Sequence, residues 1–239
     1  VGVAALAAAA LGAAVPVARA ADECRGLPVC LPVAGPWVVI PAPAPGERTS
    51  TVVWELRCPL RGYIVAGIDA RLGDAAIDVS FRGENGAPVA PGITTGRSVL
   101  FTATYAGTAS KRTVFRPFAG CVPTQGGGGR AQTVHVPRTL AAVRPGRPIE
   151  RVVTRARFGA GATRSATAAC QRGDRLVGSS HAFGFHSRLE PGTSLLGLAD
   201  ASHVERGTRA IGRGTASPAL PGGMQVELQV HALCARSGR

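Results

Sequence analysis

Ser179, His181 and a few acids are the side chains with which this sequence could perform hydrolysis. A serine hydrolase needs a nucleophilic serine in a sharp turn such as Gly-x-Ser-x-Gly, with a histidine and a carboxylate brought to it. No such pentapeptide occurs. Ser179-Ser180-His181 follows the aliphatic pair Leu176-Val177 on an expected strand, where neighbours face opposite sides. We therefore predict no catalytic residue.

Nitrogen and carboxylate ligands gather in one part of the chain, at His181, His186, Asp200 and His203. None of them has the His-x-x-x-His or Cys-x-x-Cys spacing that places two ligands on one metal ion. His181 and His186 also have opposite strand parity. A glycosidase would need two opposed carboxylates in a cleft, and the 14 scattered acids show no such pairing. We predict no metal site and no cofactor.

The basic charge is the more informative feature. The formal net charge is +13, and it is concentrated in the second half. Ten Lys and Arg face eight acids in residues 21–128, whereas 16 Arg face six acids in residues 129–239. Guanidinium groups pair bidentately with phosphate or carboxylate, so this distribution suits an anionic polymer.

Residues 149–158 show how these cations could be presented. If they form a strand, Val152, Ala156 and Phe158 face the core and the alternate residues face outward. The predicted binding residues are the outward arginines of this strand, Arg151, Arg155 and Arg157. The alternative is a solvated basic surface written by a GC-rich genome, because only Lys111 is a lysine. No specific nucleic-acid partner is predicted, since the basic stretch holds one aromatic residue and base stacking requires several.

The elements that would position these side chains are strands. With 32 Gly and 18 Pro punctuating short Val-rich runs, and no long stretch at helical spacing, the composition predicts an all-β fold. Residues 225–234 alternate cleanly between polar and apolar, which places Cys234 on the core side. Residues 77–82 alternate likewise and lead to an Asn85-Gly86 turn. The other expected strands are 51–58, 97–105, 112–121, 149–158 and 203–211.

The six cysteines indicate an oxidising compartment. The apolar residues 1–20 end in Ala-Arg-Ala, so we expect a truncated signal peptide, a secreted or envelope-associated protein, and disulfides in place of metal sites. Separations of 63 and 64 residues then favour Cys58 with Cys121 and Cys170 with Cys234. Cys24 lies six residues before Cys30 and is expected to pair with it.

The sequences that follow Cys58 and Cys170, the first cysteines of the two long disulfide loops, are similar. Aligned without a gap on Cys58 and Cys170, Ile64-Val65 falls on Leu176-Val177. A bridge from an early strand to the last strand pins a two-sheet sandwich through its core. We therefore expect two tandem β-sandwich domains, each with an intradomain disulfide, over residues 21–128 and 129–239, joined by a Gly linker at 126–129. Trp54 precedes Cys58 and the second unit has no Trp, so an immunoglobulin topology is not expected.

This layout of an export signal and repeated units resembles secreted actinobacterial proteins with repeated Cys-x-x-Gly-x-x-x-Val-x-Gly β units, a group without a known function. The resemblance covers the whole mature chain, and the second unit departs from it with Gln171 in place of Pro59. It implies export and repetition, and it transfers no catalytic or binding residue.

Three classes of function follow from these observations. We favour a non-catalytic envelope or extracellular binding module whose basic second domain contacts anionic wall polymers or lipid head groups. The second class is a structural or protein-interaction protein whose protein partner is unknown. The third is a hydrolase of unrecognised type, so enzymatic activity is the least favoured alternative.

Overall fold

A computed structural model of the chain describes residues 24, 29–83, 96–108, 110–123 and 149–236. These residues are nearly all β, with one short helix, α1 (Thr193–Leu196). The all-β prediction is therefore confirmed. The expected signal peptide, the Asn85-Gly86 turn, the Gly linker and the domain boundary at residue 128 lie outside the described residues.

We call the described residues up to 123 the first half and residues 149–236 the second half. The strands of the first half are β1 (Leu31–Ala34), β2 (Trp37–Ile40), β3 (Ser50–Arg57), β4 (Tyr63–Leu72), β5 (Ile77–Gly83), β6 (Ser98–Tyr105) and β7 (Thr113–Pro123). The strands of the second half are β8 (Ile149–Phe158), β9 (Thr163–Ala169), β10 (Arg175–His186), β11 (Ala199–Arg206), β12 (Arg209–Ala216) and β13 (Gln225–Ala235).

One antiparallel sheet runs through both halves. Its order is β1-β7-β2-β10-β13-β8, and β4 also pairs with β7. The halves meet where β2 pairs with β10, at Val38 with Gly184 and Trp37 with Phe185. Each half adds one three-stranded sheet, β3-β6-β5 in the first and β9-β12-β11 in the second. Because the large sheet is shared, a division into two tandem sandwich domains is not confirmed.

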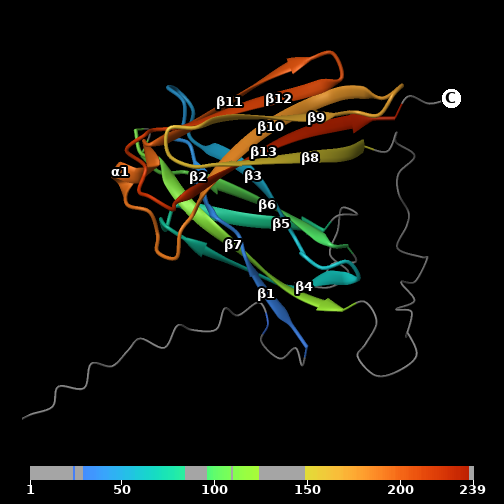
Figure 1. The fold of residues 1–239 in the computed structure, drawn as a ribbon, viewed down its shortest axis with the longest axis horizontal. Coiled ribbons are helices and arrows are strands. Elements are labelled where there is room, and N and C mark those ends of the chain that lie inside the picture. The colour runs from blue at the N-terminus through green and yellow to red at the C-terminus, as the bar shows by residue number, and fades with distance from the viewer. Residues whose placement is uncertain (1–23, 25–28, 84–95, 109, 124–148, 237–239) are drawn as a thin grey trace, which may run out of the picture.

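The two three-stranded sheets cover opposite faces of the large sheet. Successive side chains of a strand face opposite sides, and in β2 Trp37 and Val39 join one core whereas Val38 and Ile40 join the other. The first core lies under β3-β6-β5 and the second core under β9-β12-β11. Figure 1 shows the resulting layers, with β3-β6-β5 lying between the β8-β13-β10 part and the β7-β4 part of the large sheet.

All three predicted disulfides are present, Cys24–Cys30, Cys58–Cys121 and Cys170–Cys234. Cys58 directly follows β3 and Cys170 directly follows β9, and their partners lie in β7 and β13. The side chains of both long-loop bridges are buried. Each bridge therefore ties a three-stranded sheet to the large sheet, as the loop spacing predicts.

The ungapped alignment of the two cysteine motifs is wrong by one residue. Val65 pairs with Cys121 and Leu176 pairs with Cys234, and a bulge follows each pair. The physical reason is a turn one residue longer after Cys58. Gly62, with φ +79°, follows its cysteine by four residues, whereas Gly173, with φ +90°, follows by three.

The expected strand at residues 203–211 is also wrong, because the chain reverses inside it. β11 ends at Arg206 and β12 begins at Arg209, with only Gly207 and Thr208 between them. Gly207 has φ +59°, and among the described residues only glycines have a positive φ. A two-residue loop with glycine first is a type II′ turn, whose twist matches that of the flanking strands.

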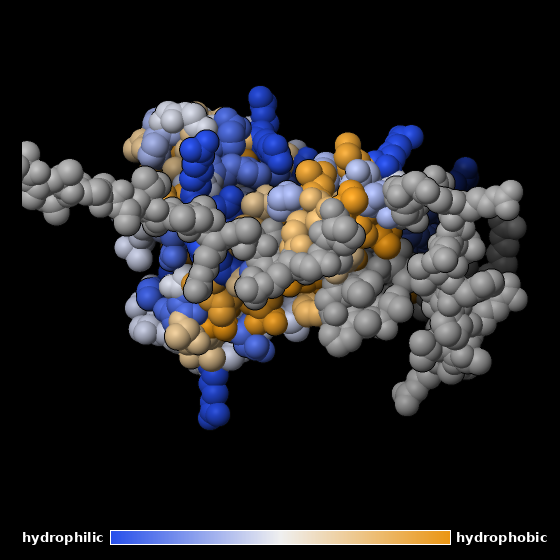
Figure 2. All heavy atoms as spheres, turned by 90° about the horizontal axis from the view of Figure 1, so that it is seen from below, coloured by the Kyte–Doolittle hydropathy of each residue, from blue (hydrophilic) through white to orange (hydrophobic). Residues whose placement is uncertain are grey.

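The side of the molecule formed by β1, β4 and β7 carries apolar side chains next to polar ones (Figure 2). On β7 the guanidinium of Arg116 lies 5.5 Å from the ring centre of Phe118 and 5.8 Å from that of Trp37. Burial and the nearby Arg71 lower the pKa of Arg116. These contacts connect the outer side of β7 to the second core, to which Trp37 belongs.

Candidate functional site

The three arginines predicted to bind an anionic polymer lie on β8, on the side facing away from the second core. Phe158 is buried in that core, and Val152 and Ala156 pack against it, so the parity of the strand is confirmed. The opposite side of β8 is not simply solvent, because β3 of the first half lies close to it. Arg155 reaches Glu55 there.

The polar side of β13 is buried. Glu227 is 4% exposed and both Gln229 and His231 are 0% exposed. Alternation places these residues opposite Leu228, Val230 and the other core residues, and from the sequence it resembles a solvated face. Buried polar groups need partners, and the neighbouring strands β8, β10 and β3 provide them.

Gln229 joins the two halves through the backbone of Glu55. Its side-chain oxygen accepts from the Glu55 N–H at 2.9 Å, and its side-chain nitrogen donates to the Glu55 carbonyl at 2.9 Å. Arg155 donates to the same carbonyl at 3.1 Å and to the Glu55 carboxylate at 2.7 Å. We call the set Glu55, Arg155, Arg157, Glu227 and Gln229 the polar seam.

Glu227 is the most strongly paired acid of the polar seam. Its carboxylate accepts from Arg157 at 2.8 Å and contacts Arg155 at 3.5 Å and His186 at 3.0 Å. Burial raises its pKa, but the hydrogen bonds from His186 and Arg157 and their charges outweigh that effect and hold the pKa at about 2. Glu227 is therefore ionised in the folded protein at any ordinary pH.

His231 is held neutral beside the seam. Burial, the charge of Arg151 and the charge of Arg155 lower its pKa to about 3. Its Nδ1 lies 3.3 Å from an Arg151 nitrogen, which must be the donor. Burial likewise lowers the pKa of Arg151. His231 Nε2 has no partner among the described residues.

The predicted arginine stripe is therefore largely committed to contacts within the protein. The side chain of Arg155 is 32% exposed and bridges Glu55 and Glu227, whereas Arg157 is 64% exposed and pairs with Glu227. Only Arg157 presents much of its surface to a ligand. Polymer binding by the three residues together remains a prediction, and the geometry assigns Arg155 a role in joining the halves.

Unpaired cations lie on the outer face of β9-β12-β11 instead. Arg206 and Arg209 are directly opposite across the hairpin, and Arg213 lies on the same face of β12, opposite Ser202. All three side chains are exposed, and none has an ion pair among the described residues. Like charges directly opposite destabilise an antiparallel pair.

Hydroxyl side chains share the outer face with these cations. Thr163, Ser165 and Thr167 share the outer side of β9, and the Thr163 and Thr215 hydroxyls are 3.2 Å apart. The acid of this face is Asp200, which pairs with Arg112 of the first half at 3.3 Å. The face therefore combines three uncompensated guanidinium groups with hydroxyl donors, an arrangement suited to phosphate or carboxylate oxygens. The sequence signal for it was present, but the missed turn at Gly207 concealed the pairing.

The four residues considered as metal ligands are separated by the fold into three places. His186 contacts Glu227 in the polar seam, Asp200 pairs with Arg112, and His181 and His203 face each other with their Nδ1 atoms 2.8 Å apart. Burial lowers the pKa of His181. Within the described ranges, no group of three or more His, Cys, Asp or Glu side chains is arranged around a common metal position.

Ser179 is not activated as a nucleophile. Its hydroxyl donates to the Glu205 carboxylate at 2.7 Å, whereas a catalytic serine donates to a histidine. Ser180 pairs with His231 in the strand register, so it faces the other side of β10. The described residues thus bring together no Ser-His-carboxylate relay.

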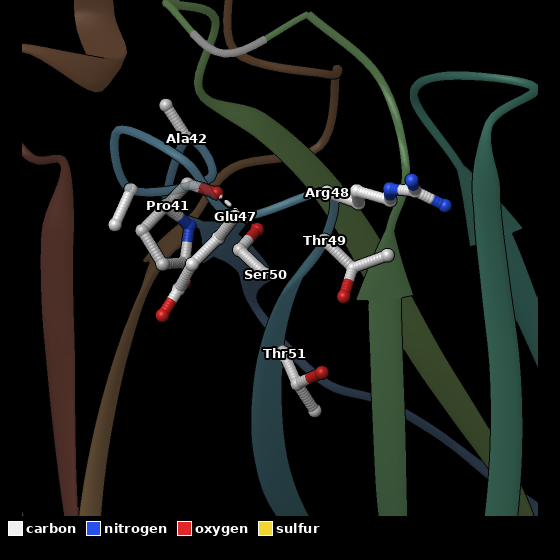
Figure 3. Close-up of a pocket in the computed structure, with 8 residues that line it drawn as sticks. Pro41, Ala42, Glu47, Arg48, Thr49, Ser50 and Thr51 are labelled. Carbon is white, nitrogen blue, oxygen red and sulfur yellow. Dashed lines mark hydrogen bonds between the residues drawn. The ribbon is translucent and has the colours of Figure 1, made fainter.

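A shallow open groove of about 720 Å³ lies along the connection from β2 to β3. It is lined by Pro41, Ala42, Ala44, Glu47, Arg48, Thr49, Ser50 and Thr51. The Ser50 hydroxyl donates to the Pro41 carbonyl, and Arg48 points away from Glu47 (Figure 3). Its lining holds no histidine or cysteine and does not form a catalytic arrangement.

Comparison with known proteins adds no assignment. No family model matches the chain, and no curated protein or solved structure shows significant similarity to it. Among the helices of the described residues, none is long and apolar enough to cross a membrane. Three disulfides indicate folding in an oxidising, extracellular environment.

Proposed function

We propose that this protein is an exported, non-catalytic binding module that contacts anionic polymers of the cell wall. The observation that carries the proposal is the outer face of β9-β12-β11, where Arg206, Arg209 and Arg213 are exposed and lack ion pairs among the described residues. A ligand that supplies negative charge would relieve the repulsion between Arg206 and Arg209.

Export and repetition belong to the same proposal. The disulfides support residence outside the cytoplasm, and residues 1–20 would be the signal that takes the chain there. We infer that the chain consists of two copies of one sandwich unit, because β3, β4, β6 and β7 pair as β9, β10, β12 and β13 do. The second copy would carry the ligand and the first would support it.

Arg151, Arg155 and Arg157 have a secondary part in this proposal. Arg157 is exposed enough to reach a polymer, whereas Arg155 is required by Glu55 and Glu227. Replacing all three with Ser would therefore test stability as much as binding. This ambiguity does not arise for Arg206, Arg209 and Arg213, which we call the hairpin arginines, because their replacement leaves no buried acid unpaired.

The test is a salt-dependent pull-down on a purified anionic wall polymer. We expect the parent to bind, and binding to weaken steeply as salt is added, because neutralised charges on the polymer release counterions. A cation near an anionic surface contributes about 1 kcal/mol, so replacing Arg206, Arg209 and Arg213 with Ser should weaken binding roughly 100-fold.

The matched control removes the same charge elsewhere. Arg48, Arg61 and Arg71 are exposed in the first half, and their replacement with Ser should change binding much less. Equal loss in both triple variants would show that only net charge matters. Salt-insensitive binding, or none to the polymer, would favour the alternative of a structural or protein-interaction role. Vesicles with anionic head groups distinguish a lipid surface from a wall polymer.

A further inference from the structure

A polar group of four side chains lies between β10 and β11, apart from the arginine face. Ser179 and His181 of β10 face His203 and Glu205 of β11. β11 is an edge strand of its sheet, so this part of the second half lies at an open side of the molecule. His181 and His203 are both partly buried.

The hydrogen bonds of His181 determine its tautomer. Its Nε2 lies 2.9 Å from the backbone carbonyl of Ala201, and because a carbonyl only accepts, Nε2 must carry the proton. The Nδ1 lone pair then points at Nδ1 of His203, 2.8 Å away. A backbone carbonyl that holds the far nitrogen and aims the near one is the usual arrangement around a metal-binding histidine.

His203 can present a lone pair to the same point. Without a metal it donates its Nδ1 proton to His181, and when the proton moves to Nε2 its Nδ1 becomes a second ligand. Two Zn–N bonds of about 2.0–2.1 Å at a tetrahedral angle place the nitrogens about 3.3 Å apart. The two rings need to separate by only about 0.5 Å from their present positions to accommodate the ion.

The first half shows what this place contains when it is only structural. Counting from Val65 and Leu176, the residues paired with the disulfide cysteines, Ala70 corresponds to His181 and Ile68 to Ser179. Phe81 pairs with Phe101 as His203 pairs with Gly212, so Phe81 corresponds to His203. The corresponding positions thus hold Ala70 and Phe81 in one half and two facing imidazoles in the other.

We propose that His181 and His203 bind a divalent first-row transition metal ion of the kind that imidazole prefers, Zn²⁺ or Cu²⁺. Water completes the coordination sphere, since the described residues provide no third ligand in place. The site is independent of the proposed polymer binding, because neither histidine lies on the outer face of β9-β12-β11.

The test is calorimetric titration of the untagged, disulfide-bonded full chain with Zn²⁺ and with Cu²⁺. Losing a mere outer-shell partner weakens a metal site roughly 10- to 100-fold, so His181→Ala and His203→Phe should each weaken binding by at least that much. These substitutions introduce the residues that the first half has at the corresponding positions. His186→Asn removes a different histidine and should leave the affinity unchanged.

Spectroscopy on the unaltered protein keeps the test independent of how the variants fold. The electron paramagnetic resonance spectrum of the Cu²⁺ complex should show coupling to two imidazole nitrogens. In nitrogen NMR, Zn²⁺ should shift the Nδ1 resonances of His181 and His203 and leave their Nε2 protonated. Absence of binding by the parent, or an affinity unchanged in the double variant His181→Ala/His203→Phe, would overturn the proposal.

Discussion

Across β3, β6 and β5 the first half places Trp54, Phe101 and Phe81 side by side, all facing the first core. The corresponding row of the second half holds Ala166, Gly212 and His203. Further along the same strands, Tyr105 corresponds to Ala216. Thus the strand pairing of the two halves is similar, whereas the side chains on the three-stranded sheets differ greatly in volume.

The second half supplies the missing volume from the large sheet. Phe158, Phe183 and Phe185 fill its core from β8 and β10. A Cβ added to Gly212 would lie 2.3 Å from Cγ2 of Val230, and one added to Gly214 would lie 2.6 Å from Cζ of Phe158. Interiors are packed near crystal density, so the comparison shows that the summed volume of two facing layers is constrained more tightly than any single position.

The largest expected effect comes from separating the halves. Trp37, Val39 and Val114 of the first half are part of the second core. Residues 149–239 expressed alone would lose these contacts and expose the β10 edge that pairs with β2. We expect this fragment to show no cooperative unfolding transition in calorimetry, whereas the full chain does.

The full chain offers a graded version of that experiment. Trp37 is fully buried, and Trp37→Ala should lower the free energy of unfolding by about 3–5 kcal/mol.

The fragment experiment has a clear contradicting outcome. If the isolated second half unfolded cooperatively, with Cys170 and Cys234 still bridged, the description of a shared core would be wrong.

Removing one aromatic side chain from the first core should have the next largest effect. Phe101 is 1% exposed, and Phe101→Ala should lower the free energy of unfolding by about 3–5 kcal/mol, as measured in guanidinium.

At the position of the second half that corresponds to Phe101, Gly212→Ala should lower the free energy of unfolding by about 1–3 kcal/mol through overpacking against Val230. A stabilising Gly212→Ala would show that the second half does not depend on small residues there.

Lowering the pH should destabilise the protein through Glu227 of the second half. The corresponding position in the first half is Val114, which carries no titratable group. Burial raises the pKa of Glu227, but the hydrogen bonds from His186 and Arg157 hold it at about 2, below the ordinary 4.5. Because the folded pKa is the lower one, this stabilisation is complete above pH 4.5 and is lost as the pH falls towards 2.

The lowering of the Glu227 pKa from 4.5 to about 2 corresponds to about 3 kcal/mol of folding free energy, since one pKa unit is about 1.4 kcal/mol. The free energy of unfolding should be measured as the pH is lowered from about 5 to about 2, where carboxylates titrate. It should decline less steeply for Glu227→Gln than for the parent. Parallel pH profiles for the two proteins would show that Glu227 is not the responsible group.

Local patterns in the sequence were sufficient for β3, β5, β6, β7, β8 and β13, for the disulfides and for the parity of β8 and β13. Cys58 with Cys121 and the burial of Phe158 follow from spacing and alternation alone. The burial of Gln229 does not, because its partner Glu55 lies 174 residues away and belongs to the other half. For the same reason Arg155 was expected to be solvated.

The histidine pair was missed for a similar reason. His181 and His203 are 22 residues apart on different sheets, and no local spacing rule connects them. Their meeting depends on the bulge in β10 and on where β11 begins. The hairpin arginines were concealed by a single glycine, since residues 203–211 were expected to form one strand and Gly207 reverses it.

The two long disulfides also determine how the molecule responds to mechanical tension. A pull between the chain ends follows the shortest covalent route, which crosses from Cys58 to Cys121 and again from Cys170 to Cys234. The enclosed loops, with separations of 63 and 64 residues, bear no extension while the sulfur bonds are intact. Force would act on the strands outside these loops, which are β1, β2 and β3 before Cys58 and β8 and β9 between the two bridges. A protein held by a wall polymer at one end could thus be stretched only through the chain before Cys58, between the two bridges and after Cys234.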